Sequence, residues 1–212
     1  DGKTKPYKAN NGSGYTLEAL LDIIPNSEKK PDKYGYEIKT ISKSSVSLMT
    51  PTADGGEEHD LGFKKFMIRN GWKSKKDDKK IVFTGPYKNE EINNNIKMLL
   101  KGYLKKENKF DAVENINLVL NKLTNLAEIS KWSFNKFFHS WETKHANAIY
   151  IKNERDSINN KYKYSNIVYV CHGTSIWRML KALIDKKIYY DPGHEVYIKG
   201  HTKYPDGKVW QR

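Results

Sequence analysis

The chain has 212 residues, a formal net charge of +13, and 37% hydrophobic, 12% aromatic and 30% charged residues. This profile is typical of a folded soluble domain and excludes an intrinsically disordered chain. An apolar run of about 18 residues and a signal-peptide pattern are both absent, so the sequence points neither to a membrane nor to secretion. The single Cys171 excludes an internal disulfide and fits a reducing cytoplasm, where we expect the protein to act.

The positive charge favours an anionic polymer, and first of all nucleic acid, as the partner. The alternative is compositional. The chain is rich in Lys, Asn, Ile and Tyr and has few arginines, which an A·T-biased genome would produce without any nucleic-acid function. Charge alone favours nucleic-acid binding only slightly over that alternative.

Apolar spacing in the first half predicts a helix over residues 15–24, ended by Pro25 and Asn26. Strands over 34–41 and 45–50 are predicted to pair as a hairpin. The order then continues with a helix over 61–70 ended by Gly71, a lysine-dense loop over 73–80 and a short strand over 81–84. We expect the loop to be solvated, with phosphate contact as the alternative. Residues 90–109 fit either a helix interrupted at Gly102 or two strands meeting there.

The second half is predicted to contain both element types. The order is a strand over 116–120, a helix with one aromatic side over 130–145, strands over 148–151 and 166–171, a helix over 174–184, and short strands over 189–190 and 195–199. This alternation indicates a mixed α/β protein without repeats or a clean domain boundary.

One short stretch carries the residues for metal chemistry. Glu37 and Lys39 are two apart, so on a strand they share one face while Ile38 points to the other. A straight strand would hold Asp32 and Glu37 about 16 Å apart, so the chain between them must turn if both are to reach one ion, and Gly35 permits a turn. Two carboxylates and the carbonyl of Ile38 are oxygen ligands that suit Mg²⁺, with Lys39 close to the attacking water or the phosphate. Such a pattern arises by chance in about one in ten lysine-rich chains of this length, so a solvated strand face is the alternative.

The P-D-x4-E-x-K pattern of residues 31–39 resembles the signature of PD-(D/E)XK nucleases. The flanks GSGYTLE at 12–18 and SLMT at 47–50 narrow the resemblance to the MvaI/BcnI-type restriction endonucleases, relatives of the MutH and Sau3AI nucleases. The segment KHAN at 144–147 and the strand–helix–strand order near the end are collinear with it.

This resemblance implies a restriction-endonuclease-like α/β core, with a central mixed β-sheet flanked by helices, in a single nuclease domain over 1–212. It implies a two-lobed clamp around double-stranded DNA, the catalytic lobe mainly 12–130 and the recognition lobe mainly 131–212. The chain begins later than a typical member and stops soon after Trp210, so we expect a missing arm or closing strand to weaken affinity more than chemistry.

The activity implied is that of a type II-like, Mg²⁺-dependent endonuclease. It would act as a monomer, cutting the strands in sequence at a short, nearly palindromic, CCNGG-like site, and a cognate DNA methyltransferase is expected in the host. The alternatives are a MutH-like nicking enzyme and a non-catalytic DNA-binding module that retains the fold.

The same resemblance assigns roles to single residues. Asp32 and Glu37, with the Ile38 carbonyl, would ligate the metal; Lys39 would act on the water and the phosphate, and Glu18 would be an accessory acid. Candidates for DNA contact are Lys144, His145, Asn147, Asp191, His194, Lys199, His201, Lys203 and Arg212. Basic side chains can donate to guanine and an acid can accept from cytosine, while contact with phosphate or water is the equal alternative for each.

Two other groupings do not favour catalysis. Cys171 and His172 are adjacent, so on a strand they point to opposite faces, and the simpler interpretation is a strand end leading into a helix start at Thr174. His139 and His145 are six apart, which places them on different helix faces and argues against a zinc pair.

Overall fold

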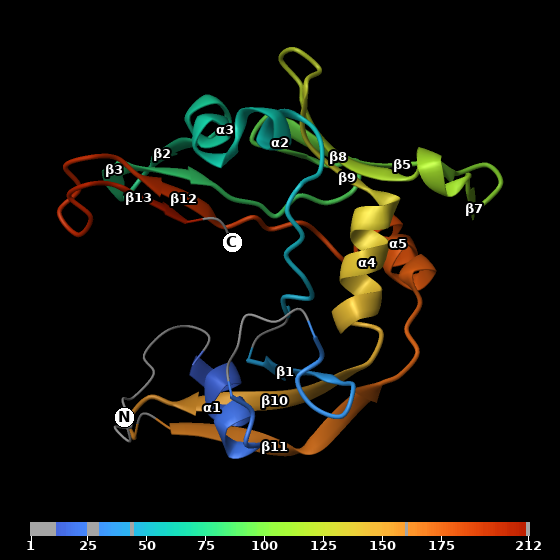
Figure 1. The fold of residues 1–212 in the computed structure, drawn as a ribbon, viewed down its shortest axis with the longest axis vertical. Helices are drawn as coiled ribbons and strands as arrows, with labels where there is room; N and C mark the ends of the chain where they lie inside the picture. Colours follow the sequence, from blue (N-terminus) through green and yellow to red (C-terminus); the bar gives the residue numbers. More distant parts are fainter. Residues whose placement is uncertain (1–11, 25–29, 43–44, 160, 211–212) are drawn as a thin grey trace. The chain divides into compact units, whose positions relative to one another are not determined.

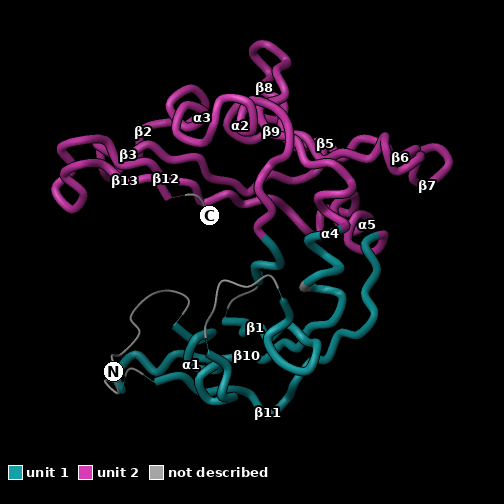
Figure 2. Tube along the Cα trace, in the orientation of Figure 1, with its two compact units in different colours: residues 1–49, 139–176 teal, residues 50–138, 177–212 magenta. Residues whose placement is uncertain are grey.

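The computed structural model describes residues 12–24, 30–42, 45–159 and 161–210, and Arg212 lies outside them. The chain forms two compact units, one within residues 1–49 and 139–176 and the other within 50–138 and 177–212 (Figure 2). Each unit therefore combines two separate stretches of sequence, whereas the sequence suggested consecutive lobes. Which unit cleaves and which recognises DNA stays a prediction.

Unit 1 is built on a mixed three-stranded sheet in the described part of the chain (Figure 1). Its strands, in the order β1-β10-β11, are β1 (Glu37–Ile41), β10 (Ala148–Asp156) and β11 (Lys161–Cys171). β1 runs parallel to β10, and β10 and β11 form an antiparallel pair. The short β1 thus depends on a strand from far later in the chain.

Helix α1 (Gly12–Leu20) packs on one face of this sheet. The Ser13 hydroxyl lies 3.0 Å from that of Thr40 on β1, and the Tyr164 hydroxyl donates to the Ser13 carbonyl at 2.7 Å. Leu17, one helical turn after Ser13, is also buried. Because Thr40 alternates with Lys39, α1 covers the face opposite Glu37 and Lys39.

Unit 2 contains two antiparallel four-stranded sheets within the described residues. One has the order β13-β12-β3-β2, made of β2 (Trp72–Ser74), β3 (Asp77–Phe83), β12 (His194–Tyr197) and β13 (Lys208–Trp210). The other has the order β4-β5-β8-β9, made of β4 (Ile92–Asn93), β5 (Ile96–Lys101), β8 (Asn117–Lys122) and β9 (Glu128–Ser133).

The remaining elements are shorter or helical. They are the pair β6 (Tyr103–Leu104) and β7 (Lys109–Phe110), the 3₁₀ turn Val113–Asn115, and helices α2 (Glu57–Leu61), α3 (Phe63–Asn70), α4 (Phe134–Lys144) and α5 (Ile176–Ile184). Fully buried aromatic and aliphatic side chains form the core of unit 2, among them Phe66, Phe83, Met98, Leu120 and Trp132. None of the described helices has the length and apolar character needed to cross a membrane.

Several sequence predictions of local structure are confirmed. A helix does precede the carboxylate segment, although α1 both begins and ends earlier than expected, at Gly12 and Leu20, and Pro25 and Asn26 lie outside the described residues. Gly71 ends α3, and its N–H donates to the Met67 carbonyl at 2.9 Å. Between 90 and 109, the strand alternative is correct, with β5 and β6 meeting at Gly102. Gly102 has φ 80°, and a Cβ there would lie 2.8 Å from the Asn115 carbonyl oxygen, so only glycine fits.

Other local predictions are wrong, because strand pairing decides the structure at these positions. Residues 45–50 form no strand, since β1 pairs with β10 instead of a hairpin partner. Residues 73–80 are a hairpin of β2 and β3 and not a loop. Residues 130–133 continue β9, with Ser130 and Trp132 buried as alternate residues of a strand, and the helix starts only at Phe134. Tyr190 forms only an isolated bridge with Tyr87.

Candidate active site

The chain between Asp32 and Glu37 turns, as the metal hypothesis requires. Lys33 and Tyr36 form an antiparallel bridge, in which each N–H donates to the other's carbonyl at 3.1 and 2.9 Å. The two residues between them, Tyr34 and Gly35, have φ values of 51° and 78°. Positive φ at both central residues is the signature of the tight I′ hairpin turn. A straight strand here would have refuted the hypothesis.

The turn carries the Asp32 carboxylate back to β1. Its Oδ2 accepts a hydrogen bond from the Ile38 N–H at 2.7 Å. On the other side, the Glu37 N–H donates to the Asn147 carbonyl at 3.1 Å. The backbone N–H and C=O of Glu37 therefore point towards β10, and those of Ile38 point towards the edge of the described sheet. Because a residue's N–H and C=O lie on the same side of a strand, the Ile38 carbonyl and the Asp32 carboxylate share this edge.

Glu37 and Lys39 form a close pair on the face that α1 leaves uncovered. The Lys39 Nζ donates to Glu37 Oε1 at 3.0 Å, and Glu37 is only 4% exposed. The predicted common face of these two side chains is therefore confirmed. Tyr150 pairs with Lys39 across β1 and β10 and lies beside the two side chains. Burial, and to a smaller extent the negative fields of Cys171 and Glu37, raise the pKa of its phenol. The Tyr150 phenol is therefore uncharged and lines one side of the site.

Glu18 lies half-buried on α1. Its carboxylate folds back along the helix, with Oε1 4.0 Å from the position of a Cβ on Gly14. The end of α1 is tied to the turn because the Lys33 ammonium donates to the Leu21 carbonyl. The accessory role of Glu18 stays a prediction, since these contacts connect the helix and the turn without placing Glu18 at Asp32.

The oxygen atoms on the edge of β1 suit a hard cation. Among the described residues, no group of three or more His, Cys, Asp or Glu side chains could hold a metal. The candidate set is instead two carboxylates, Asp32 and Glu37, and the Ile38 carbonyl. Mg²⁺ is commonly held by one or two carboxylates while waters and substrate phosphates fill its other positions. Zn²⁺ would be expected to use Cys or His, so the donors fit magnesium better.

The end of β11 supports the turn in a way that sequence reasoning missed. The Tyr36 hydroxyl lies 3.1 Å from Nδ1 of His172, 136 residues later. The neighbouring Gly173 N–H donates to Asn147 Oδ1 at 2.9 Å, and the Thr174 hydroxyl donates to the Ala146 carbonyl at 3.0 Å. Residues 171–175 are thus a strand end leading into α5. A separation of this size leaves no signal in the sequence.

The predicted DNA-contacting residues differ in whether they are buried or exposed. His145 and His194 are 4% and 2% exposed, so neither presents a surface to a base. Asp191 is exposed, but its Oδ1 accepts from the Gly85 N–H at 3.1 Å, and the Asn147 side-chain oxygen is engaged as described above. Lys199 and Lys203 are exposed, whereas His201 is 8% exposed.

His194 is a neutral core residue. It packs edge-on against Phe63 and stacks on Phe83, with ring centroids 5.0 and 6.2 Å away. Burial lowers the pKa of its imidazole to about 4, outweighing the Glu58 carboxylate 3.9 Å from Nε2. The free energy of unfolding therefore falls as the pH drops from 6.5 towards 4, because the unfolded chain binds a proton that the folded chain refuses.

We expect this one histidine to cost about 2 kcal/mol of stability between about pH 7.5 and about pH 5. The measurement is urea unfolding at both pH values for the native chain and the His194→Gln variant. The variant cannot titrate at this position, so its loss should be smaller by that amount. An equal loss in both proteins would show that His194 is not the buried neutral group described.

A mixed sheet whose edge strand carries Glu-x-Lys, with an aspartate turned back onto the same edge, defines the class of restriction-endonuclease-like nucleases. A family model, the MvaI/BcnI restriction endonuclease family, matches residues 2–210. The chain belongs to this family and is a type II restriction endonuclease, a hydrolase that cleaves DNA.

One solved structure supports the fold. The chain is similar to restriction endonuclease MvaI in a complex with its cognate DNA substrate, with 17% identity, 99% of this chain and 91% of that chain covered, and a TM-score of 0.66. For MvaI in the absence of DNA the identity is 16%, the coverage 92% and 76%, and the TM-score 0.49. No curated protein matches the chain.

Proposed function

We propose that this restriction endonuclease uses Mg²⁺ at the edge of β1 to cut double-stranded DNA at a short, nearly palindromic site. The observation that carries the proposal is the hydrogen bond from the Ile38 N–H to Asp32, which brings the Asp32 carboxylate to the strand that carries Glu37 and Lys39. A solvated strand face would not require the Lys33–Tyr36 turn.

Each residue of the site has a distinct task in this proposal. Asp32, Glu37 and the Ile38 carbonyl would hold the cation, which when bound polarises the phosphate and lowers the pKa of a bound water. Lys39, 3.0 Å from Glu37, would orient that water and stabilise charge on the phosphate oxygens. Glu18, on the helix tied to the turn, would be an accessory acid.

Further parts of the proposal follow from family membership. The enzyme would act as a cytoplasmic monomer that cuts one strand and then the other, with unit 1 holding the chemistry and unit 2 contacting bases. A cognate methyltransferase would protect the host DNA. Lys144, Asn147, Asp191, Lys199, Lys203 and Arg212 remain candidates for DNA contact, whereas His145, His194 and His201 are better assigned to the protein interior by their burial.

The metal and the pattern of cutting can be tested on supercoiled plasmid DNA. With Mg²⁺, we expect open circles first and then linear DNA, and EDTA should stop both steps, with activity restored by excess Mg²⁺. Accumulation of open circles alone would instead indicate a nicking enzyme. Plasmid that is bound but stays supercoiled with every divalent metal would indicate a DNA-binding module without catalysis.

A further inference from the structure

The connection between β12 and β13, residues 198–207, has its own hydrogen bonds. The Gly200 N–H donates to the Pro205 carbonyl at 2.7 Å, and the Gly207 N–H donates to the Tyr204 carbonyl at 2.8 Å. Gly207 has φ 81°, and a Cβ there would lie 2.8 Å from the Tyr197 carbonyl oxygen, so the tight return to β13 requires glycine. The connection therefore presents its side chains from a defined backbone.

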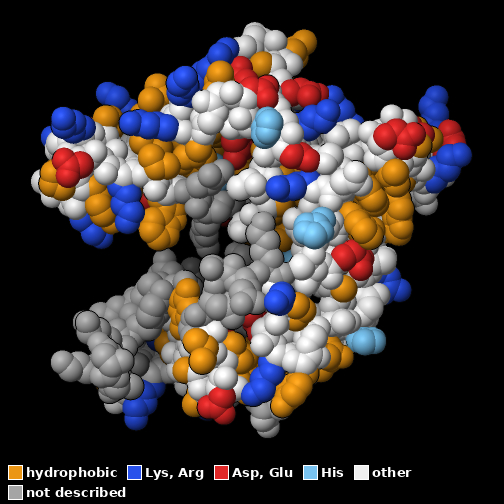
Figure 3. Space-filling view, in the orientation of Figure 1, with side chains coloured by type: hydrophobic (Ala, Val, Ile, Leu, Met, Phe, Trp, Pro, Cys, Tyr) orange, Lys and Arg blue, Asp and Glu red, His pale blue; other side chains and the backbone are white. Residues whose placement is uncertain are grey.

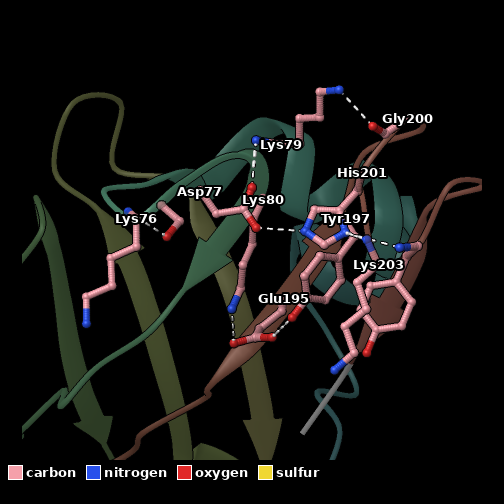
Figure 4. Close-up of polar contacts among 11 residues, drawn as sticks. Lys76, Asp77, Lys79, Lys80, Glu195, Tyr197, Gly200, His201 and Lys203 are labelled. Carbon is pink, nitrogen blue, oxygen red and sulfur yellow. Dashed lines mark hydrogen bonds and ion pairs between the residues drawn. The ribbon is translucent and has the colours of Figure 1, made fainter.

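His201 fixes this loop to β3, as Figure 4 shows. Its Nε2 lies 2.8 Å from Asp77 Oδ2, and its Nδ1 accepts from the N–H groups of Lys203 and Tyr204 at 3.1 and 3.2 Å. A nitrogen that accepts two N–H groups carries no proton, so the ring proton is on Nε2 and is donated to Asp77. Both nitrogens are thus engaged, and the predicted contact of His201 with a base is incompatible with this arrangement.

Two further contacts hold the loop to β3. The Lys79 ammonium donates to the Gly200 carbonyl at 2.7 Å (Figure 4). The Ile198 N–H donates to the Lys79 carbonyl at 2.8 Å. On the adjacent strands, Lys80 donates to Glu195 at 2.6 Å. These lysines serve the structure of the hairpins and are not free for an external anion.

A different set of lysines faces outward. Lys208 lies over the rings of Tyr204 and Trp210, with Nζ 4.8 and 5.0 Å from their centroids, and the Lys203 ammonium is 5.4 Å from the Tyr204 centroid. Trp210 is 52% exposed. Neither ammonium forms an ion pair with an acid in the part of the chain that the structure describes. We call Lys203, Tyr204, Lys208 and Trp210 the lysine–aromatic surface.

The chemistry of this surface selects its partner. An ammonium resting on a ring has already lost much of its rotamer freedom, so binding an anion orders it at less cost. Figure 3 shows Lys and Arg side chains interspersed with hydrophobic ones, a class that includes Tyr and Trp, across the part of unit 2 in view. A basic surface of ordered lysines beside exposed aromatic rings suits the phosphate backbone of nucleic acid.

We propose that the lysine–aromatic surface contacts the DNA backbone through Lys203 and Lys208, and that His201 is a positioning residue that holds it. The inference rests on the proposed function, which supplies DNA as the partner. It adds Lys208 to Lys203 as a residue that contacts the backbone, gives Tyr204 and Trp210 the role of holding the two ammonium groups, and removes His201 from the DNA-contacting set.

The salt dependence of DNA binding tests the surface. In a cleavage-deficient Asp32→Asn background, the dissociation constant of a cleavable duplex is measured between about 50 and about 200 mM salt. We expect Lys208→Gln to weaken binding about fivefold to tenfold at about 0.1 M salt and to reduce the slope of log K against log salt by about 0.9. The control Lys105→Gln removes a lysine that is ion-paired with Glu90 at 2.6 Å, and it should change neither quantity.

The positioning role of His201 is tested by the salt slope of DNA binding, a quantity that a purely structural role would not change. His201→Ala removes the ring that links the loop to Asp77, and we expect it to reduce the salt slope by releasing Lys203 and Lys208 from position. His201→Asn retains an acceptor near the place of Nδ1 and should restore part of the loss. Adding Lys208→Gln to His201→Ala should lower the slope by less than the two separate effects together.

Different results would contradict the proposed function and the inference about the lysine–aromatic surface. If the background protein binds duplex and Lys208→Gln keeps its affinity and slope, this inference is wrong and the proposed function stands. If neither binding nor cleavage of DNA is detected for the native chain, the proposed function fails and this inference fails with it. Melting temperatures identify a variant that does not fold, and Lys208→Gln, at a partly exposed position, decides the matter if His201→Ala unfolds.

Discussion

Replacing Asp32 by Asn should reduce the rate of DNA cleavage by about 10³-fold or more and leave DNA binding close to that of the native chain. The variant keeps an oxygen at the position that accepts the Ile38 N–H at 2.7 Å, so the turn is preserved. It loses the negative charge needed to hold a divalent cation. Charge stabilisation by such a cation provides several kcal/mol in the transition state, which corresponds to this loss in rate. Cleavage of a cognate duplex at saturating protein measures the effect.

Asp32→Ala is the matched comparison. It removes both the charge and the acceptor, so the Lys33–Tyr36 turn loses its link to β1. If the two variants lose cleavage equally while both stay folded, the charge of Asp32 is what matters. Cleavage by Asp32→Asn that continues in EDTA would contradict the assignment of Asp32 to a metal site.

Replacing Lys39 by Met should reduce cleavage by about 10²- to 10⁴-fold, the range typical of a positioned group that assists proton transfer. Methionine has similar length and volume but carries no charge, so packing on β1 is largely kept. It removes the ammonium 3.0 Å from the buried Glu37 carboxylate, so some loss of stability is also expected. Single-turnover cleavage and urea unfolding separate the two effects.

The control for Lys39 is Lys152→Met on the neighbouring strand. Lys152 is exposed and lies over the ring of Tyr169, 5.6 Å from its centroid. Its loss should leave single-turnover cleavage near the native rate. Equal losses in both variants would mean that Lys39 contributes only to the general positive charge of the chain.

The local part of the site could be predicted from sequence. The two-residue spacing of Glu37 and Lys39 fixes their common face, and the distance argument requires a turn at Lys33–Tyr36, with Gly35 able to adopt positive φ. These features depend on neighbouring residues alone. The flanking motifs then identified the family correctly.

The long-range part could not be predicted. The parallel partner of β1 and the Tyr36–His172 contact come from the second half of the chain. His145 was a candidate for DNA contact from its place in the KHAN segment, and His194 and His201 from theirs in the basic C-terminal segment. Tertiary packing buries all three, and the sequence around them carries no mark of that burial.

Digestion of mixed genomic DNA with Mg²⁺, followed by sequencing of the fragment ends, tests directly whether the chain is a site-specific, metal-dependent nuclease. We expect the native chain to produce ends at one short recurrent sequence, and Asp32→Asn and EDTA each to abolish these ends. Fragment ends without a common sequence, or ends that persist in EDTA or with Asp32→Asn, would contradict a site-specific metal-dependent nuclease centred on Asp32, Glu37 and Lys39.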